Sequence, residues 1–211
     1  MPDYGWNGKK YYDLDTGRFV SNAAVRDSLE QVIEQGAINM RYLSEQLVNG
    51  EISLANWQRG MMEQIKLSHN AGGALANGGW AQMSQSDWGF AGSKIKKQYE
   101  FLDKFANQIA NGKQELNGQV IFRADLYGQA PRGTYEAQRQ RLEVANGMEE
   151  ERRILEVSDG ANCAGCLEQA GLGWQPIGTL GMIGSQECNN NCRCEFTYRR
   201  IENGEIITSD E

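Results

Sequence analysis

The chain has 211 residues, which is enough for one large domain or two small ones. It carries 21 Lys and Arg against 28 Asp and Glu, and the resulting net charge of −7 disfavours a partner held mainly by its phosphates. No apolar run approaches the roughly 18 residues of a membrane span, and the first residues have neither the basic end nor the apolar stretch of a signal peptide. We therefore expect a protein made in a reducing cytoplasm, without a membrane partner.

Residues 1–20 are predicted to form an extended, aromatic N-terminal arm. Asp15-Thr16-Gly17 lies between Tyr11-Tyr12 and Phe19-Val20, which is typical of a turn between two short strands. The same triplet activates the nucleophile of aspartic proteases, but that site needs strands after the triplet and a second carboxylate. Because a long helical pattern follows here, we interpret the triplet as a turn.

Two long helices are predicted after the arm. Ser21 is a good N-cap, and the apolar residues after it recur at steps of three and four, as one face of a helix requires. These residues are Val25, Leu29, Val32, Gly36, Met40, Leu43 and Leu47. Gly50 ends this helix and Ser53 caps the next, whose apolar face contains Leu54, Trp57, Met61 and Ile65. The short link between the two favours an antiparallel helical hairpin.

Residues 70–93 are interrupted by glycines and are predicted to form a structured or adaptable loop packed on the helices. The glycines are Gly72, Gly73, Gly78, Gly79, Gly89 and Gly92. Trp80, Trp88 and Phe90 give this loop apolar surface to bury.

Three further helices are predicted beyond the loop. The first ends at Gly112, and its apolar face contains Ile95, Tyr99, Leu102, Phe105 and Ile109. A shorter helix is predicted over residues 116–127, and Pro131-Arg132-Gly133 breaks it. Thr134 then caps a last helix that runs to about Gly147. That helix is polar on most sides, so we expect it to lie at the surface or to be covered by a partner protein.

Two polar features are interpreted as solvated surface, without a role in a site. Residues 149–153, Glu-Glu-Glu-Arg-Arg, are most simply an exposed charged face. His69 is the single histidine and is expected to be solvated at the polar end of the second helix. A single histidine excludes most catalytic and metal sites that are built from imidazoles.

After residue 153 the pattern changes to short strands and turns. Strands are predicted at residues 154–157, 194–198 and 206–208. The fold class is therefore mainly α: a long helical hairpin and further helices, followed by a small, zinc-ribbon-like β module. The predicted organisation is an arm at 1–20, a helical body at 21–150 and a cysteine-clustered β module at 151–211.

All five cysteines lie in this last region, as Cys163-x2-Cys166 and Cys188-x3-Cys192-x-Cys194. Two such groups facing each other provide the four thiolates of a tetrahedral Zn²⁺ site, and a region with few large apolar groups needs such a cross-link. Four of the five cysteines would bind the metal, and the spacing does not say which four. Disulfides are the alternative, since a particle later exposed to air could acquire them, and unbound buried thiols are a third possibility. A catalytic zinc is not expected, because four thiolates leave no open position.

A nucleic-acid-binding zinc ribbon is disfavoured by charge. Residues 158–211 contain three basic and eight acidic side chains, which gives this segment a net charge of −5. A β module that supports a contact with another protein is more consistent with this acidic charge.

The cysteine pattern, a Cys-x2-Cys followed by a Gly-rich stretch and Cys192-Arg193-Cys194, resembles the C-terminal part of phage head morphogenesis proteins. These are minor capsid proteins similar to phage Mu protein F. Upstream segments are similar to the same family: Tyr12-Asp13, residues 16–20, residues 50–53 with Trp57, and Tyr127-Gly128. Many members have a histidine shortly before the Cys-x-Cys, whereas Asn189 to Asn191 occupy that stretch here.

The resemblance implies a non-enzymatic structural protein of a tailed-phage virion. Such a protein assists head assembly near the portal vertex or the head–tail junction. Its partners would be portal, capsid or neck proteins and copies of itself, and it would be assembled in the host cytoplasm. The alternative is a zinc-ribbon adaptor that joins proteins outside a virion.

Overall fold

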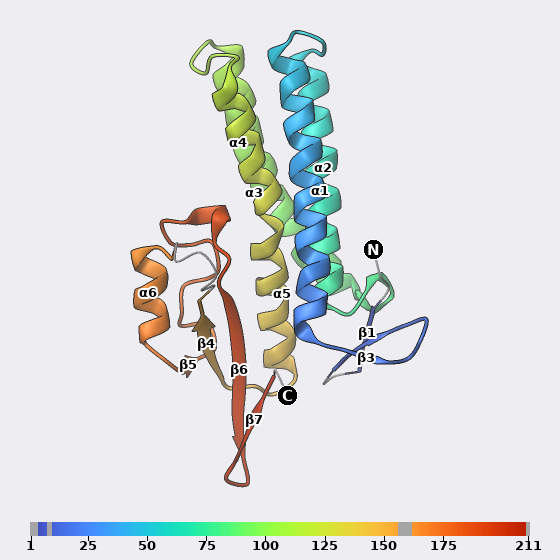
Figure 1. The fold of residues 1–211 in the computed structure, drawn as a ribbon, viewed down its shortest axis with the longest axis vertical. Helices are drawn as coiled ribbons and strands as arrows, with labels where there is room; N and C mark the ends of the chain where they lie inside the picture. The colour runs from blue at the N-terminus through green and yellow to red at the C-terminus, as the bar shows by residue number, and fades with distance from the viewer. Residues whose placement is uncertain (1–3, 8–9, 156–161, 210–211) are drawn as a thin grey trace.

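The structure is a computed structural model and describes residues 4–7, 10–155 and 162–209. Four helices form a rod that rises from a broader base (Figure 1). The helices of the rod are α1 (Asn22–Val48), α2 (Leu54–Ala76), α3 (Gln85–Ala110) and α4 (Gly118–Gln129). The fifth, α5 (Pro131–Ala145), continues from α4 into the base, where a small sheet lies on either side (Figure 1).

The helical hairpin and its caps are confirmed. The Ser21 side chain accepts a hydrogen bond from the Ala24 backbone, and the Ser53 side chain accepts one from the Asn56 backbone. The 27 residues of α1 give it a length of roughly 40 Å. The core of the rod is built around Trp57, whose indole N–H donates to Ser44 Oγ at 2.9 Å and whose ring meets Phe105 edge-on.

The prediction of a loop over residues 70–93 is wrong. Helix α2 continues through the first two glycines to Ala76, a short 3₁₀ helix, η1, follows at Trp80–Gln82, and α3 begins at Gln85. A Cβ at Gly72 would lie 3.0 Å from the Pro131 carbonyl oxygen, so this glycine allows α2 and α5 to approach closely. The turn itself is made at Gly78 and Gly79, where φ is 82° and 122°, values that L side chains rarely adopt.

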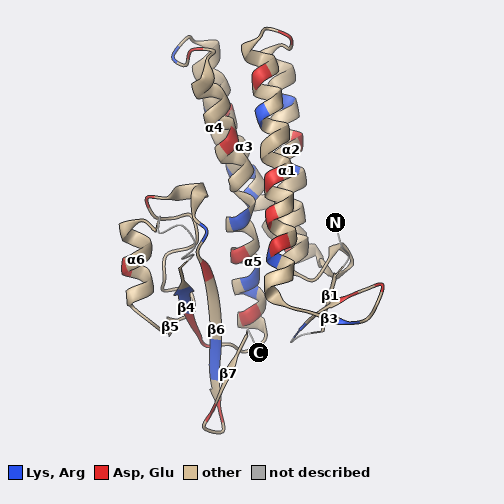
Figure 2. Ribbon diagram, in the orientation of Figure 1, with Lys and Arg blue, Asp and Glu red and all other residues tan. Residues whose placement is uncertain are grey.

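Helix α5 is buried, which overturns the prediction that it lies at the surface. It begins at Pro131 without a break after α4, so Thr134 lies inside the helix and does not cap it. The helix packs against α2 on one side and the C-terminal sheet on the other. Its buried polar residues are Arg132, Thr134, Glu136, Gln138, Arg139 and Glu143. Residues of both charges lie along it (Figure 2), and the buried ones pair with one another or with neighbouring elements.

The N-terminal arm is a three-stranded antiparallel sheet in the order β1 (Tyr4–Trp6), β2 (Tyr11–Asp13) and β3 (Phe19–Val20). The predicted turn after β2 is present: Asp13 Oδ1 accepts a hydrogen bond from the Thr16 backbone at 2.7 Å, and Gly17 has φ 67°. The arm packs on the helices, because Tyr11 is buried and its hydroxyl donates to the Ala76 carbonyl at 2.8 Å.

The C-terminal sheet has the order β5-β4-β6-β7 and is antiparallel throughout. Its strands are β4 (Glu150–Ile154), β5 (Gln175–Pro176), β6 (Glu195–Glu202) and β7 (Glu205–Thr208), and helix α6 (Ala164–Gly171) accompanies them. The strand predicted at 154–157 therefore begins earlier, and residues 156 and 157 lie outside the described residues. The fold class, mainly helical with a small cysteine-clustered β module, is confirmed.

The charged run at residues 149–153 is not the solvated face that we expected. Most of it forms β4, and alternation along the strand buries Glu151 and Arg153 while Arg152 stays exposed. The Glu151 carboxylate accepts hydrogen bonds from the backbone of Gly178 and Leu180, at 3.0 and 3.1 Å. It thereby holds the loop that follows β5. In the part of the chain that the structure describes, no helix combines the length and apolarity needed to cross a membrane.

Candidate metal centre

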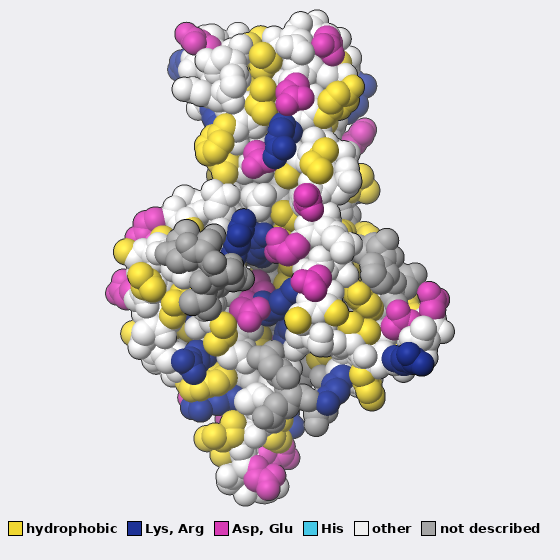
Figure 3. All heavy atoms as spheres, in the orientation of Figure 1, with side chains coloured by type: hydrophobic (Ala, Val, Ile, Leu, Met, Phe, Trp, Pro, Cys, Tyr) yellow, Lys and Arg dark blue, Asp and Glu magenta, His cyan; other side chains and the backbone are white. Residues whose placement is uncertain are grey.

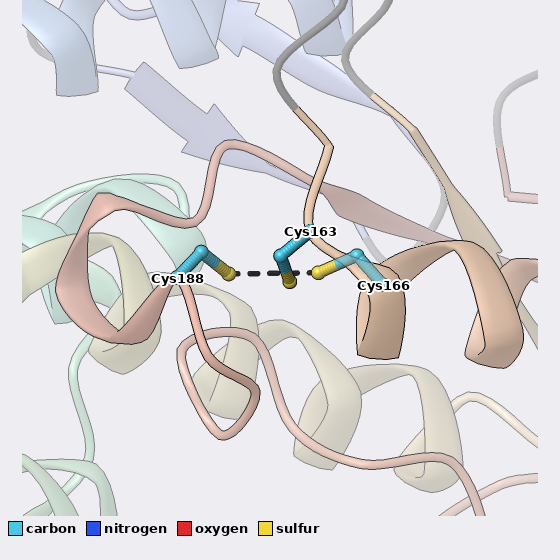
Figure 4. A group of neighbouring side chains, drawn as sticks. All are labelled: Cys163, Cys166 and Cys188. Atoms are coloured by element: carbon cyan, nitrogen blue, oxygen red, sulfur yellow. Dashed lines mark hydrogen bonds between the residues drawn. The ribbon is translucent and has the colours of Figure 1, made fainter.

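The five cysteine thiols converge on one place between two segments of the C-terminal module. Cys163 is the N-cap residue of α6 and Cys166 lies in its first turn, so both sulfurs lie at the start of that helix. Cys188 precedes the short 3₁₀ helix η2 (Asn189–Asn191), and the last two cysteines lie between η2 and β6. Figure 4 shows the side chains of the first three pointing toward one another from the two segments. The convergence predicted from the sequence is therefore confirmed.

The sulfur separations fit a shared metal ion. Cys166 Sγ lies 3.5 Å from Cys188 Sγ and 3.7 Å from Cys192 Sγ. Thiolates that each bind one ion at ~2.3 Å in a tetrahedron are roughly 3.8 Å apart, whereas a disulfide bond is about 2.05 Å long. All five cysteines are free, which excludes the predicted alternative of disulfides in this structure.

Two overlapping groups of thiols meet the geometric requirement for holding a metal. Cys163, Cys166 and Cys188 form one group, and Cys166, Cys192 and Cys194 form the other, with the sulfurs of each group within 4.8 Å of one another. Cys166 belongs to both groups. The thiols line a cavity of about 370 Å³, so a single ion has room to lie among them.

The thiols differ in how readily they lose a proton. A hydrogen bond from the Cys194 thiol lowers the pKa of Cys192 to about 4, and the same contact raises the pKa of Cys194. Burial raises the pKa of Cys166 and of Cys188. For Cys163, burial raises the pKa, but hydrogen bonds from the backbone of Cys166 and Cys188 outweigh it, and the net shift is downward. Since metal ligands must be deprotonated, a bound cation would offset the cost of ionising the buried thiols.

Two arginines next to the thiols were not recognised in the sequence. Arg153 Nη1 donates to Cys166 Sγ at 3.6 Å and to Cys192 Sγ at 3.8 Å. Arg132 donates to the Cys192 carbonyl at 3.2 Å and forms a two-pronged ion pair with Glu30 of α1, at 2.9 and 2.6 Å. The one available signal for Arg153 is strand alternation, because it lies two positions after Glu151 and therefore on the same side of β4.

His69 is not solvated and does not belong to the cysteine cavity. It is 1% exposed in α2, where its Nδ1 and Thr134 Oγ1 are 2.7 Å apart. Burial, followed by the charge of Lys94, lowers its pKa to about 4. The expectation of an exposed histidine at a helix end is therefore wrong, because α5 covers this side of α2.

Comparisons with family models, with curated proteins and with solved structures find no match to this chain. The resemblance to phage head morphogenesis proteins therefore stays a prediction from the quoted motifs. What the structure adds is the geometry of the thiols and of the groups around them.

Proposed function

We propose that the cysteine cluster holds one structural zinc ion. The single observation that carries this proposal is the convergence of five thiols from two segments, in which Cys166 Sγ lies 3.5 and 3.7 Å from the sulfurs of Cys188 and Cys192. Soft thiolates favour Zn²⁺ over the hard cations that prefer oxygen, and four thiolates leave no position for water or substrate. The ion would therefore cross-link the module and take no part in a reaction.

The zinc would also fix the face with which the module contacts the helices. The loop that contains Cys188 and Cys192 is anchored on the helical body at two points. Asn190 Nδ2 donates to the Leu126 carbonyl of α4 at 3.0 Å, and the Cys192 carbonyl accepts from Arg132 of α5. Both hydrogen bonds come from the loop that would bind the metal. A metal that orders this loop would therefore favour packing of the module against α4 and α5.

For the whole protein, we propose a non-enzymatic structural role in a tailed-phage virion, as a minor capsid, head morphogenesis or head–tail junction protein. The resemblance of the cysteine motif supports this proposal. Exposed apolar side chains also support it, because such groups are typical of surfaces that later become interfaces. Phe122 of α4 is 66% exposed and Tyr42 of α1 is 59% exposed. Hydrophobic side chains alternate with charged ones over the rod (Figure 3). Portal, capsid or neck proteins and further copies of the chain would cover them.

Metal analysis tests the zinc proposal. Protein purified under reducing conditions should contain about one zinc ion per chain, measured by mass spectrometry of the intact protein and by elemental analysis. A control in which all five cysteines are alkylated after unfolding should release the metal. Metal-free protein with five titratable thiols in the folded state would contradict the proposal.

Analysis of phage particles tests the virion proposal. In particles purified from a host that produces the phage encoding this chain, the protein should be present at a fixed, low copy number relative to the capsid protein. Deleting its gene should reduce the yield of filled heads. Particles that lack the protein and form normally without it would contradict the virion role, and zinc-loaded protein in that case would favour the adaptor.

A further inference from the structure

A buried arginine lies against the thiol cluster. The Arg153 side chain is 1% exposed, and its Nη1 is shared between the sulfurs of Cys166 and Cys192. Its Nη2 donates to the Gly181 carbonyl, and its guanidinium lies 5.2 Å from the centre of the Phe196 ring. The strand, the loop and the ring therefore hold this cation in place beside two of the five thiols.

A permanent cation at this position suits a metal bound by four thiolates. Zn²⁺ with four thiolates has a net charge of −2, and a buried net charge is costly unless it is compensated. Arginine stays protonated at any physiological pH, and it has several N–H donors in one plane. Donors to the ligand sulfurs hold them in position and stabilise their ionised form, as other groups behind metal ligands do.

The same contacts distinguish the two cysteines of the Cys-x-Cys. Cys192 Sγ accepts a hydrogen bond from Arg153 and lies 3.7 Å from Cys166 Sγ. Cys194 Sγ instead lies 3.9 Å from Asn162 Oδ1. Cys192 therefore has both the sulfur spacing expected around a shared ion and the contact with the arginine, whereas Cys194 has a separate polar partner.

We propose that Arg153 is the counter-charge of the zinc site and that Cys192 is the fourth ligand, while Cys194 does not bind the ion. The ligands are then Cys163, Cys166, Cys188 and Cys192. This inference rests on the zinc site proposed above. Arg153 is a positioning residue, since it contacts the ligand sulfurs and not the ion.

Cobalt substitution tests the choice of ligands. Co²⁺ bound by four thiolates in a tetrahedron gives strong visible bands and sulfur-to-metal charge-transfer absorption. Cys194→Ser should keep this spectrum and one ion per chain, whereas Cys192→Ser should weaken both absorptions. The reverse result, or an equal effect of the two substitutions, would overturn the assignment, because the two cysteines would then be exchanged or equivalent.

Metal competition tests Arg153. Against a chelator of known affinity, Arg153→Met should bind Zn²⁺ about 10- to 100-fold more weakly, a range typical of groups behind metal ligands. The pH at which half of the metal is released should rise, because the thiolates lose the charge that favours them. Arg152→Met is the matched control: this neighbour on β4 is exposed, and the affinity should not change.

Arg153→Lys keeps the charge but not the planar fork, so we expect an affinity between those of the wild type and Arg153→Met. If the methionine variant does not fold, the lysine variant decides: affinity and release pH equal to those of the wild type would overturn the proposal. Wild-type protein that binds no zinc would contradict the site itself. If the wild type binds zinc and the Arg153 variants bind it with the same affinity, only the role of the arginine would be contradicted.

Discussion

The buried His69 side chain makes the stability of this protein sensitive to pH. His69 Nδ1 forms a hydrogen bond with Thr134, and its Nε2 finds no hydrogen-bond partner among the described residues. Protonation would bury both a charge and an unpaired donor, which explains why the pKa falls from 6.5 to about 4. The histidine is therefore neutral in the folded protein at pH values where the unfolded chain is already protonated.

This difference predicts a loss of stability in mild acid. Between pH 7 and pH 5 the unfolded chain takes up a proton at His69 and the folded protein does not. Lowering the pH therefore favours unfolding, by about 2 kcal/mol from this group. In His69→Gln this part of the loss should disappear, while the contribution of all other groups remains. Urea unfolding of both proteins at the two pH values measures it, and equal losses would show that the histidine is not the cause.

The burial of His69 and of Arg153 is not predicted from the sequence, for the same physical reason in both cases. The five cysteines were recognised because short spacings place thiols together regardless of the rest of the fold. Whether His69 or Arg153 is buried depends instead on α5 and on the pairing of β4 with β6, which join segments distant in sequence. Alternation along a strand shows which face a polar residue shares with its neighbours, but it does not show that a distant segment will cover that face.

At the scale of elements, close helix packing depends on glycines. Gly128 of α4 lies against α1, where an added Cβ would be 2.7 Å from both Cα and Cβ of Ala37. These atoms belong to the helix backbone and its Cβ, so α1 would have to move as a whole to make room. The separation between these two helices is therefore set by the absence of a side chain at one position.

Gly128→Ala should lower the free energy of unfolding by about 1–3 kcal/mol, the usual cost of overpacking a core. Gly92→Ala, in the exposed middle of α3, is the control: nothing lies within 4 Å of the added Cβ. That change should raise stability by about 0.5–1 kcal/mol through helix propensity. Thermal unfolding of both variants gives the comparison, and a neutral Gly128→Ala would mean that the helices separate easily.

The elements themselves were largely predictable, because caps and apolar periodicity are local signals. Ser21 and Ser53 cap helices as predicted, and the third and fourth helices lie where their patterns indicate. The prediction of a loop over residues 70–93 is wrong because a glycine need not interrupt a helix. Only Gly78 and Gly79 adopt positive φ, whereas Gly72 serves contact with α5.

Considered as a whole, the molecule has a helical core that is separate from the cysteine cluster. The core around Trp57 draws all its residues from α1 to α4 and their connections, and none from the module. The module has a separate core in which three buried cysteines pack with Phe196 and Tyr198. Loss of the thiol cluster should therefore affect the two parts unequally.

Cys163→Ser, or removal of the metal, should unfold the module and leave the helices largely intact. Trp174 is the single tryptophan of residues 151–211, and its ring stacks with the Arg199 guanidinium at 4.4 Å. In protein labelled with 5-fluorotryptophan, the ¹⁹F resonance of Trp174 should move to its unfolded position while that of Trp57 stays. The helical circular-dichroism signal should change little, and a parallel loss of helix would show that the two parts unfold as one unit.

The contact between Gly128 and Ala37 also has a consequence for recognising homologous proteins. A homologue can differ in most surface side chains and still keep this helix packing, provided that it has a glycine at the position where the two backbones meet. Relatives too divergent for overall comparison should therefore be detectable by a sparse signature. It consists of a glycine near the end of the fourth helix, an arginine ten residues before the first cysteine, and sulfur at the spacings found here.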